Sequence, residues 1–337
     1  MFAQQTGAAF VTNVSNPIPR SGDQVIPQTS NAMKILLLFA ALLAVFVAMN
    51  NLTGLALHNA SATAMRGLAY LGLLLLAILA SMLMLAMGIL AHDGVHRVLF
   101  RSAFVNDLVS GLLSAFGGGL PFYANRQFHL RHHAHAHQGE QDSEHNLHHS
   151  SFLYAFFIGP LAGFVLQYKL MLGNFWKGLR EPKFLVRAAK DFGFITLAVV
   201  CYTAGLSALG ISPLKTILPA LLVLPFTFSF RALSDHFGLP RVKRYRETLE
   251  NSDDENEAIV RRSNQQVTGW VIITAPWLEW LWSSVNYHEV HHKFPYLSHL
   301  YLKQAYAATR DTYPYREVQG YIRSLIYLRN KDYYSEE

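Results

Sequence analysis

Long stretches without a charged side chain constrain this chain more than any other feature. Ile35–Met49 is an unbroken apolar run, and Gly67–Ala91 adds 25 residues without a charge. Phe192–Leu214 and Thr216–Phe230 form a second pair of such segments. A helix rises about 1.5 Å per residue and the hydrocarbon core of a bilayer is about 30 Å thick, so each segment, with its flanks where needed, is long enough to cross. We therefore expect an all-α integral membrane protein with about four transmembrane helices.

The basic residues predict how these helices are arranged. We expect two hairpins, residues 35–91 and 192–231, with residues 92–191 and 232–337 forming a cap on one face of the membrane. Of the 28 Lys and Arg, only Arg66 and Lys215 then fall on the opposite face. The positive-inside rule makes the basic face the cytosolic one, in a bacterial inner membrane or the endoplasmic reticulum. The formal net charge of +6 is explained by this topology, so it does not indicate nucleic-acid binding.

The N-terminal residues differ in composition from the rest. Residues 1–33 are polar, contain several Gly and Pro, and lack a basic segment followed by an apolar core. We expect a flexible tail rather than a signal peptide. Residues 34–337 are expected to form a single membrane domain.

Three other apolar segments are expected to lie at the membrane surface. Ser151–Tyr168 carries no charge, but if it crossed the bilayer alone it would separate His236 from the earlier histidines. We therefore expect an interfacial or re-entrant helix there. Phe104–Phe122 and Val267–Trp282 are expected to be surface helices, the latter with four tryptophans suited to the headgroup region.

The grouping of the 16 histidines indicates a metal site. His92 and His96 are four residues apart, and two later groups have the spacing i, i+3, i+4, which places their rings on one face of a helix. A single histidine near a membrane surface is usually solvated or hydrogen-bonded, as we expect for His58 and His299. That explanation does not suit grouped histidines on one face of the membrane. The candidate ligands are His92, His96, His129, His132, His133, His236, His288, His291 and His292.

The kinds of ligand narrow the choice of metal. The chain has one cysteine, Cys201, which excludes a cysteine zinc ribbon, an iron-sulfur cluster and a redox dithiol. A zinc ion takes three or four protein ligands, whereas eight or nine histidines are enough for two ions with open positions. Soluble di-iron carboxylate proteins need two Glu-x-x-His pairs, and here only Glu289 and His292 have that spacing near the groups.

Neutral imidazoles leave the metal charge uncompensated, so we expect polar side chains to hydrogen-bond the ligands. The candidates, chosen because they stand beside a presumed ligand in sequence, are Asp93, Asp235, Glu289 and Asn286. The remaining acids and histidines after the second group are expected to form a solvated, His-enriched loop, namely His135, His137, Glu140, Asp142, Glu144, His145, His148 and His149.

These motifs resemble those of the integral-membrane fatty acid desaturase and hydroxylase superfamily. The resemblance covers roughly residues 88–300 and rests on HDGVH at 92–96, HLRHH at 129–133, DHFG at 235–238 and NYHEVHHKFP at 286–295. It implies a four-helix transmembrane bundle with a cytosolic cap that holds two irons through the nine histidines. His236 is the least specific of these ligands, because it rests on one residue in a looser motif.

By resemblance, the activity is oxygen-dependent oxidation of a lipid chain. Dioxygen and external electrons at two iron ions would remove hydrogen from an unactivated methylene, giving an alkene, or an alcohol if a hydroxyl is transferred. No side chain then has to act as nucleophile or general base. We favour desaturation of a fatty acyl chain, because the residues flanking the third group read most like acyl desaturases. Hydroxylation, ketolation and oxidative decarboxylation to a terminal alkene remain alternatives.

The implied partners are a long-chain lipid substrate, membrane lipids and a separate electron donor. The chain contains no His-Pro-Gly-Gly motif of a cytochrome b5-like domain. A ferredoxin- or cytochrome b5-like protein with its reductase would therefore supply the electrons.

Two alternatives come from other classes. Residues 288–292 also satisfy His-Glu-x-x-His, the zinc protease motif in which two histidines bind zinc and the glutamate acts as general base. An intramembrane zinc protease would use His288, Glu289 and His292 but leave the other groups unexplained. A metal transporter should carry its ligands mid-membrane, whereas these histidines follow the ends of apolar segments.

Overall fold

The computed structural model describes residues 18, 25–58, 63–148, 150–237, 239 and 268–329. This part of the chain is mostly helical, and its two strands, β1 (Val271–Ile273) and β2 (Glu317–Gln319), pair in parallel over three residues each. The expected helical class is therefore confirmed.

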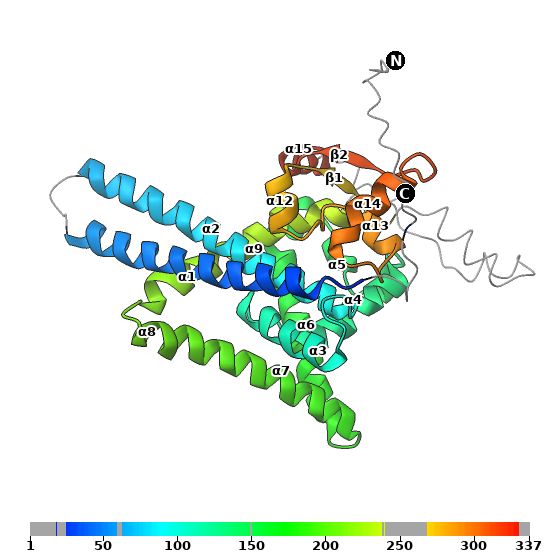
Figure 1. Cartoon of the computed structure of the whole chain (residues 1–337), viewed down its shortest axis with the longest axis horizontal. Helices are drawn as coiled ribbons and strands as arrows, with labels where there is room; N and C mark the ends of the chain where they lie inside the picture. Colours follow the sequence, from blue (N-terminus) through cyan, green and yellow to red (C-terminus); the bar gives the residue numbers. More distant parts are fainter. Residues whose placement is uncertain are drawn as a thin grey trace, which may run out of the picture.

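Long helices extend from one side of the molecule (Figure 1). Two lie side by side, and a second pair turns back near Gly210, whose φ of +73° is easily adopted without a side chain. This turn lies at the left of Figure 1, on the same side as the far ends of the first pair. The first pair is α1 (Gln28–His58) and α2 (Thr63–Val95), and the second consists of α7 (Pro182–Val200), η3 (Cys201–Gly205), α8 (Leu206–Ala208) and α9 (Pro213–His236).

The helices that could span a membrane differ in part from the expected ones. Four helices in the described residues are long and apolar enough to cross a bilayer, namely Gln28–Ala56, Ala64–Val95, Tyr154–Gly178 and Pro213–His236. The number agrees with the expectation, but the third is not the expected Phe192–Leu214. The segment expected to be interfacial forms η2 (Tyr154–Ile158) and the first half of α6 (Gly159–Gly178). Lys169 does not interrupt α6, so the helix continues past Tyr168 to Gly178. The first helix also begins earlier than expected, at Gln28.

The shorter helices surround the inner ends of α2 and α9. They are α3 (Ala103–Phe116), α4 (Phe122–His135), η1 (Gly139–Gln141), α5 (His145–His148), α12 (Pro276–Leu281), α13 (His288–Lys293), α14 (His299–Thr309) and α15 (Tyr321–Leu328).

Two expected surface helices differ from the structure. Phe104–Phe122 is helical only to Phe116, where Gly117–Gly119 ends the helix. Val267–Trp282 is wrong as a single helix: Val267 lies outside the described residues, Val271–Ile273 is a strand, and α12 begins only at Pro276. Proline is favoured in the first turn of a helix and disfavoured in its interior, which accounts for this start.

The tryptophans of this segment are divided between the core and the surface. Trp270 and Trp282 are buried, and Trp277 and Trp280 are exposed. Only the exposed pair is available for the membrane surface.

The main apolar core lies between α1, α2, α3 and α9. It includes Leu38, Phe46, Met84, Leu90 and Ala220. The outer faces of the long helices also expose many large apolar side chains, as expected for helices that face lipid rather than water. The core therefore fixes the inner ends of α2 and α9 beside the shorter helices α4 and α13, and these four elements, with the residue directly after α2, carry the candidate histidines.

Candidate metal centre

The first histidine group ends α2. His92 lies in its last turn and His96 directly follows it. Asn106 of α3 fixes this turn, because its amide donates to Gly94 O (2.8 Å) while its Oδ1 accepts from the Leu99 and Phe100 backbone amides. A Cβ at Gly94 would lie 1.7 Å from Ser110 Oγ, so only glycine permits this approach of the two helices.

The second group lies on α4, which is held at its N-terminus by α7. Pro121 offers no side-chain cap, but the Asp191 carboxylate accepts from Tyr123 N (2.8 Å) and Ala124 N (3.1 Å). A carboxylate at this position satisfies two of the free amides of the first helical turn and favours the helix dipole. His129, His132 and His133 follow on the inner side of this helix.

The third group and His236 are joined through the strand segment. His236 is the last residue of α9, and the third group occupies α13. Trp270 connects the two elements, because its amide donates to Asp235 O (2.8 Å) and its carbonyl accepts from Glu289 N (3.4 Å). The β1 segment therefore places α13 directly against the end of α9.

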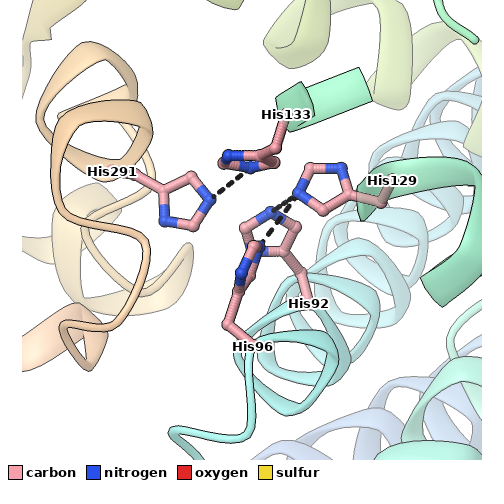
Figure 2. A group of neighbouring side chains, drawn as sticks. All are labelled: His92, His96, His129, His133 and His291. Atoms are coloured by element: carbon pink, nitrogen blue, oxygen red, sulfur yellow. Dashed lines mark hydrogen bonds between the residues drawn. The ribbon is translucent and has the colours of Figure 1, made fainter. Parts of the chain in front are cut away.

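Five histidines from three elements form one cluster (Figure 2). His92, His96, His129, His133 and His291 each offer a nitrogen within 4.8 Å of the others. Nε2 of His129 lies 2.8 Å from Nε2 of His92 and 3.1 Å from Nε2 of His96. Nε2 of His291 lies 3.1 Å from Nε2 of His133. Figure 2 shows the rings pointing into the same space from separate elements.

A second cluster lies beside the first. His132, His236 and His292 again offer nitrogens within 4.8 Å of one another. Nε2 of His236 lies 3.0 Å from Nε2 of His132 and 2.8 Å from Nε2 of His288. The stacked rings of His133 and His292, 4.1 Å apart, link the two clusters. All nine candidate histidines are therefore brought together, and Ser151–Tyr168 does not separate His236 from the earlier groups.

The hydrogen bonds of His236 and His132 through Nδ1 show which ring nitrogen carries the proton and which keeps a lone pair. Nδ1 of His236 contacts the Thr268 carbonyl at 2.5 Å, and Nδ1 of His132 contacts an Asp142 carboxylate oxygen at 2.8 Å. A carbonyl and a carboxylate accept hydrogen bonds, so both Nδ1 atoms carry the proton. In its neutral form each ring then presents a lone pair at Nε2, and these two Nε2 atoms are only 3.0 Å apart. Burial disfavours a charge on His132, but Glu144 and Asp142 outweigh it and raise the pKa of this ring. Two lone pairs at this distance repel unless a proton or a metal ion lies between them.

The arrangement fits a metal ion. Two nitrogens that bind one ion at about 2.1 Å and at right angles lie about 3.0 Å apart, which is the spacing of the close Nε2 pairs. Burial and the neighbouring imidazoles hold the pKa values of His96, His133 and His291 well below 6.5, so these rings are neutral at pH 7. Neutral imidazole is the form that binds iron, zinc or copper.

Carboxylates from the loop after α4 support the ligands, against our expectation of solvated charges. Asp142 is buried, and it accepts from His132 Nδ1, His137 N (2.9 Å) and Glu144 N (2.8 Å). A Glu144 oxygen lies 3.7 Å from Nδ1 of His129. Asp235 forms a buried ion pair with Arg231 at 2.8 Å and lies 3.7 Å from Nδ1 of His288.

The other expected supporting residues make different contacts. Asp93 accepts from Nδ1 of His299 at 2.6 Å, so His299 is buried and is hydrogen-bonded, which is one of the two states expected for it. Asn286 donates to Ile272 O at 2.9 Å. Glu289 accepts from Thr268 and from the Tyr313 hydroxyl. Within the described residues, the side chains of Asp93, Asn286 and Glu289 therefore hold neighbouring segments of the chain together and do not hydrogen-bond the candidate ligands.

His137 was also placed in the solvated loop, and that prediction is wrong. Its ring is buried, its Nε2 lies 2.8 Å from the same Thr268 carbonyl that accepts from His236, and its φ is +61°. His137 is four residues from His133, which is a helical spacing, but α4 ends at His135 and His137 lies outside the helix, so only the fold reveals the contact with Thr268. His149 lies outside the described residues, and no side-chain placement is described for His58 and His148.

Comparison with known proteins agrees with this geometry. Residues 68–322 match the model of the fatty acid desaturase family, which is more than half of the chain. No curated protein shows significant similarity to the chain.

Proposed function

Because this chain belongs to the fatty acid desaturase family, we propose that it inserts a carbon–carbon double bond into a fatty acyl chain at a pair of iron ions. Membership makes the chain a lipid-acting membrane oxidoreductase. We propose three further points: that the reaction is desaturation, that two irons are bound, and that the nine histidines are their ligands.

One observation carries it: buried imidazole lone pairs meet in two adjacent clusters. His92, His96, His129, His133 and His291 would hold one ion, and His132, His236, His288 and His292 the other. When bound, the irons would supply the activation of dioxygen. The overall change removes two hydrogens from adjacent methylenes and, with one O₂, two electrons and two protons, gives an alkene and two waters.

The chain's own residues hold the ligands in one protonation state. The Thr268 carbonyl and Asp142 keep protons on the Nδ1 atoms of His236 and His132, so their Nε2 lone pairs point toward the cluster. His236 is 2% exposed, and Leu233 and Phe237 near it in sequence are fully buried, so this part of the site is shielded from solvent. A dry site limits side reactions of activated oxygen.

The choice of desaturation over related oxidations rests on the third group. Asn286 and Tyr287 before it, and Phe294 and Pro295 after it, match the pattern of acyl desaturases noted above. Hydroxylation, ketolation and decarboxylation would use the same metal site, and product analysis distinguishes them.

The geometry gives no support to a zinc protease. A general base must face a metal-bound water, but the Glu289 carboxylate accepts from Thr268 N (2.9 Å), Thr268 Oγ1 (3.0 Å) and the Tyr313 hydroxyl. Its hydrogen bonds are made with the strand segment and the loop before β2.

The proposal includes a cytosolic orientation and a separate electron donor. The basic residues favour the histidine side of the membrane as the cytosolic one. A ferredoxin- or cytochrome b5-like protein would then reach the site from that side.

The test is product analysis with purified, iron-loaded protein. The protein is incubated with a reducing system and a panel of free acids, acyl thioesters and phospholipids, and products are identified by mass spectrometry. We expect an alkene product from one acyl class. An oxygenated or chain-shortened product would overturn desaturation, and hydrolysis of a peptide substrate would overturn the oxidoreductase.

Replacing one ligand tests the site itself. His132→Ala removes a ligand of the second cluster, so we expect loss of turnover and less bound iron. His135→Ala is the matched control, because His135 lies three residues further along α4 and contacts Gln138 instead. Full activity of His132→Ala would refute the assignment of the second group.

A further inference from the structure

An apolar groove of about 430 Å³ lies outside the histidine clusters. Its walls come from η2 and the two residues before it, from the inner end of α9 and from α15. Phe156 and Phe157 form one wall, Phe230 the second, and Ile322 and Ile326 the third. Its volume lies within the range of about 300–1,000 Å³ that is usual for ligand pockets.

The wall helices place the groove at the edge of the bilayer. Two of them, Tyr154–Gly178 and Pro213–His236, are long and apolar enough to span. On α15, Ile322 and Ile326 are 69% and 62% exposed, while Tyr321 and Leu328 are buried. A short helix with one buried face and one exposed apolar face is suited to lie in the membrane interface. The open side of the groove therefore faces the boundary between acyl chains and headgroups.

The groove wall packs against the end of α9. Phe152 and Phe156 of its wall pack against Leu233 and Phe237, which are fully buried and flank His236 in sequence. The rings of Phe152 and Phe237 have centroids 6.3 Å apart. A ligand in the groove thus lies next to the end of α9 that carries His236.

One lining residue is charged. Arg329, directly after α15, is exposed and is one of the residues that line the groove. Within residues 25–329, as far as they are described, no ion pair occupies Arg329, unlike the buried Arg231 beside Asp235. A guanidinium pairs well with a carboxylate through two parallel hydrogen bonds. The groove thus combines apolar walls with one cationic residue.

We infer that this groove binds a long-chain fatty carboxylate from the bilayer, with its acyl chain along the phenylalanines and its carboxylate on Arg329. The volume accommodates a single chain, and the one cation matches a single anionic group. Resting on the proposed function, we further assign the groove as the site where the substrate waits before it enters the metal centre. The substrate class is then a free fatty acid.

Photolabelling of the full-length protein tests binding without requiring turnover. A diazirine-bearing fatty acid, the matching fatty alcohol and a phosphatidylglycerol with the same chain are each added in nanodiscs without reductant. Labelled peptides are then mapped by mass spectrometry. We expect the fatty acid to label residues 152–157 and 321–328 several-fold more than the alcohol or the phospholipid. Equal labelling by acid and alcohol, or preferential labelling by the phospholipid, would overturn the inference.

Paired variants identify the contacts. Arg329→Gln should reduce labelling by the acid several-fold and leave labelling by the alcohol unchanged. Arg323→Gln removes the same charge from an exposed position of α15 that does not line the groove, and should have no effect. Ile326→Glu should abolish labelling by the acid, whereas Tyr327→Glu, an exposed neighbour outside the groove, should not. If the acid labels both groove variants as strongly as it labels the unmodified protein, the assignment is contradicted.

Kinetics separate this inference from the proposed function. If the groove delivers substrate, Arg329→Gln should raise KM for the free acid more than it lowers kcat. Labelling without any alkene product would refute desaturation and retain the groove. Turnover of a free acid with no groove labelling would refute the groove and retain desaturation.

Discussion

At the scale of single residues, the supporting carboxylates decide which imidazole nitrogen faces the metal centre. Asp142 accepts from three donors, namely His132 Nδ1, His137 N and Glu144 N. An amide in its place would present an NH₂ group to at least one of these donors. The site therefore requires a carboxylate at this position.

Asp142→Asn should weaken iron binding by about 10- to 100-fold, as is usual when the hydrogen-bond partner of a metal-binding histidine is lost. The measurement is retention of iron during titration with a chelator. Glu140→Gln is the control, since Glu140 is exposed and contacts Arg131 through its backbone oxygen. Equal iron retention in the two variants would show that Asp142 does not act through His132.

Sequence spacing indicated the nine histidines, but of the four supporting residues chosen beside them only Asp235 lies near a histidine of the clusters, for a geometric reason. Adjacent residues on a helix point about 100° apart, so a side chain beside a ligand faces elsewhere. Asp93 beside His92 reaches His299, and Glu289 beside His288 reaches Thr268. Asp142 and His137 act across the fold, which spacing along the chain does not reveal.

At the scale of elements, α4 carries three candidate ligands and depends on α7 for its N-terminal cap. Asp191 of α7 is buried and accepts from the amides of Tyr123 and Ala124. The helix that bears the second histidine group is thereby joined to a helix of the second long pair. This contact sets where His129, His132 and His133 lie relative to the other groups.

Asp191→Asn should lower the free energy of unfolding by about 1–2 kcal/mol, because its NH₂ group would face one of the two backbone amides. Thermal unfolding in detergent measures this, and we expect weaker iron retention in the same variant. Glu181→Gln is the control, because Glu181 forms only exposed ion pairs with Lys177 and Lys183. An unchanged midpoint for Asp191→Asn would argue against the cap.

The identity of the helices was less predictable than their number. The uncharged length of Ser151–Tyr168 did not show that the helix would continue past Lys169 to Gly178. The apolar composition of Val267–Trp282 did not distinguish the strand Val271–Ile273 from the helix that begins at Pro276. Composition identifies apolar segments, but their ends depend on capping and packing that only the fold supplies.

At the scale of the whole molecule, the histidine clusters make the metal-free protein sensitive to acid. Burial and mutual repulsion hold the pKa values of His96, His133, His288, His291 and His292 well below 6.5. As pH falls below about 6.5, the unfolded chain takes up protons that the folded chain does not, so the free energy of unfolding decreases.

We expect the thermal midpoint of chelator-treated protein to be nearly constant above pH 7 and to fall steadily from pH 6.5 to 5. His291→Gln removes one of the buried imidazoles and should make this fall shallower. A midpoint that rises or stays constant as the pH is lowered would contradict the burial of neutral histidines.

We propose that nine imidazoles from distant parts of the chain hold two irons beside the membrane. Elemental analysis of protein purified in detergent, with the protein quantified by amino-acid analysis, gives the ratio of tightly bound metal to protein. We expect about two iron atoms per chain. One zinc atom per chain, or a single iron, would contradict this proposal.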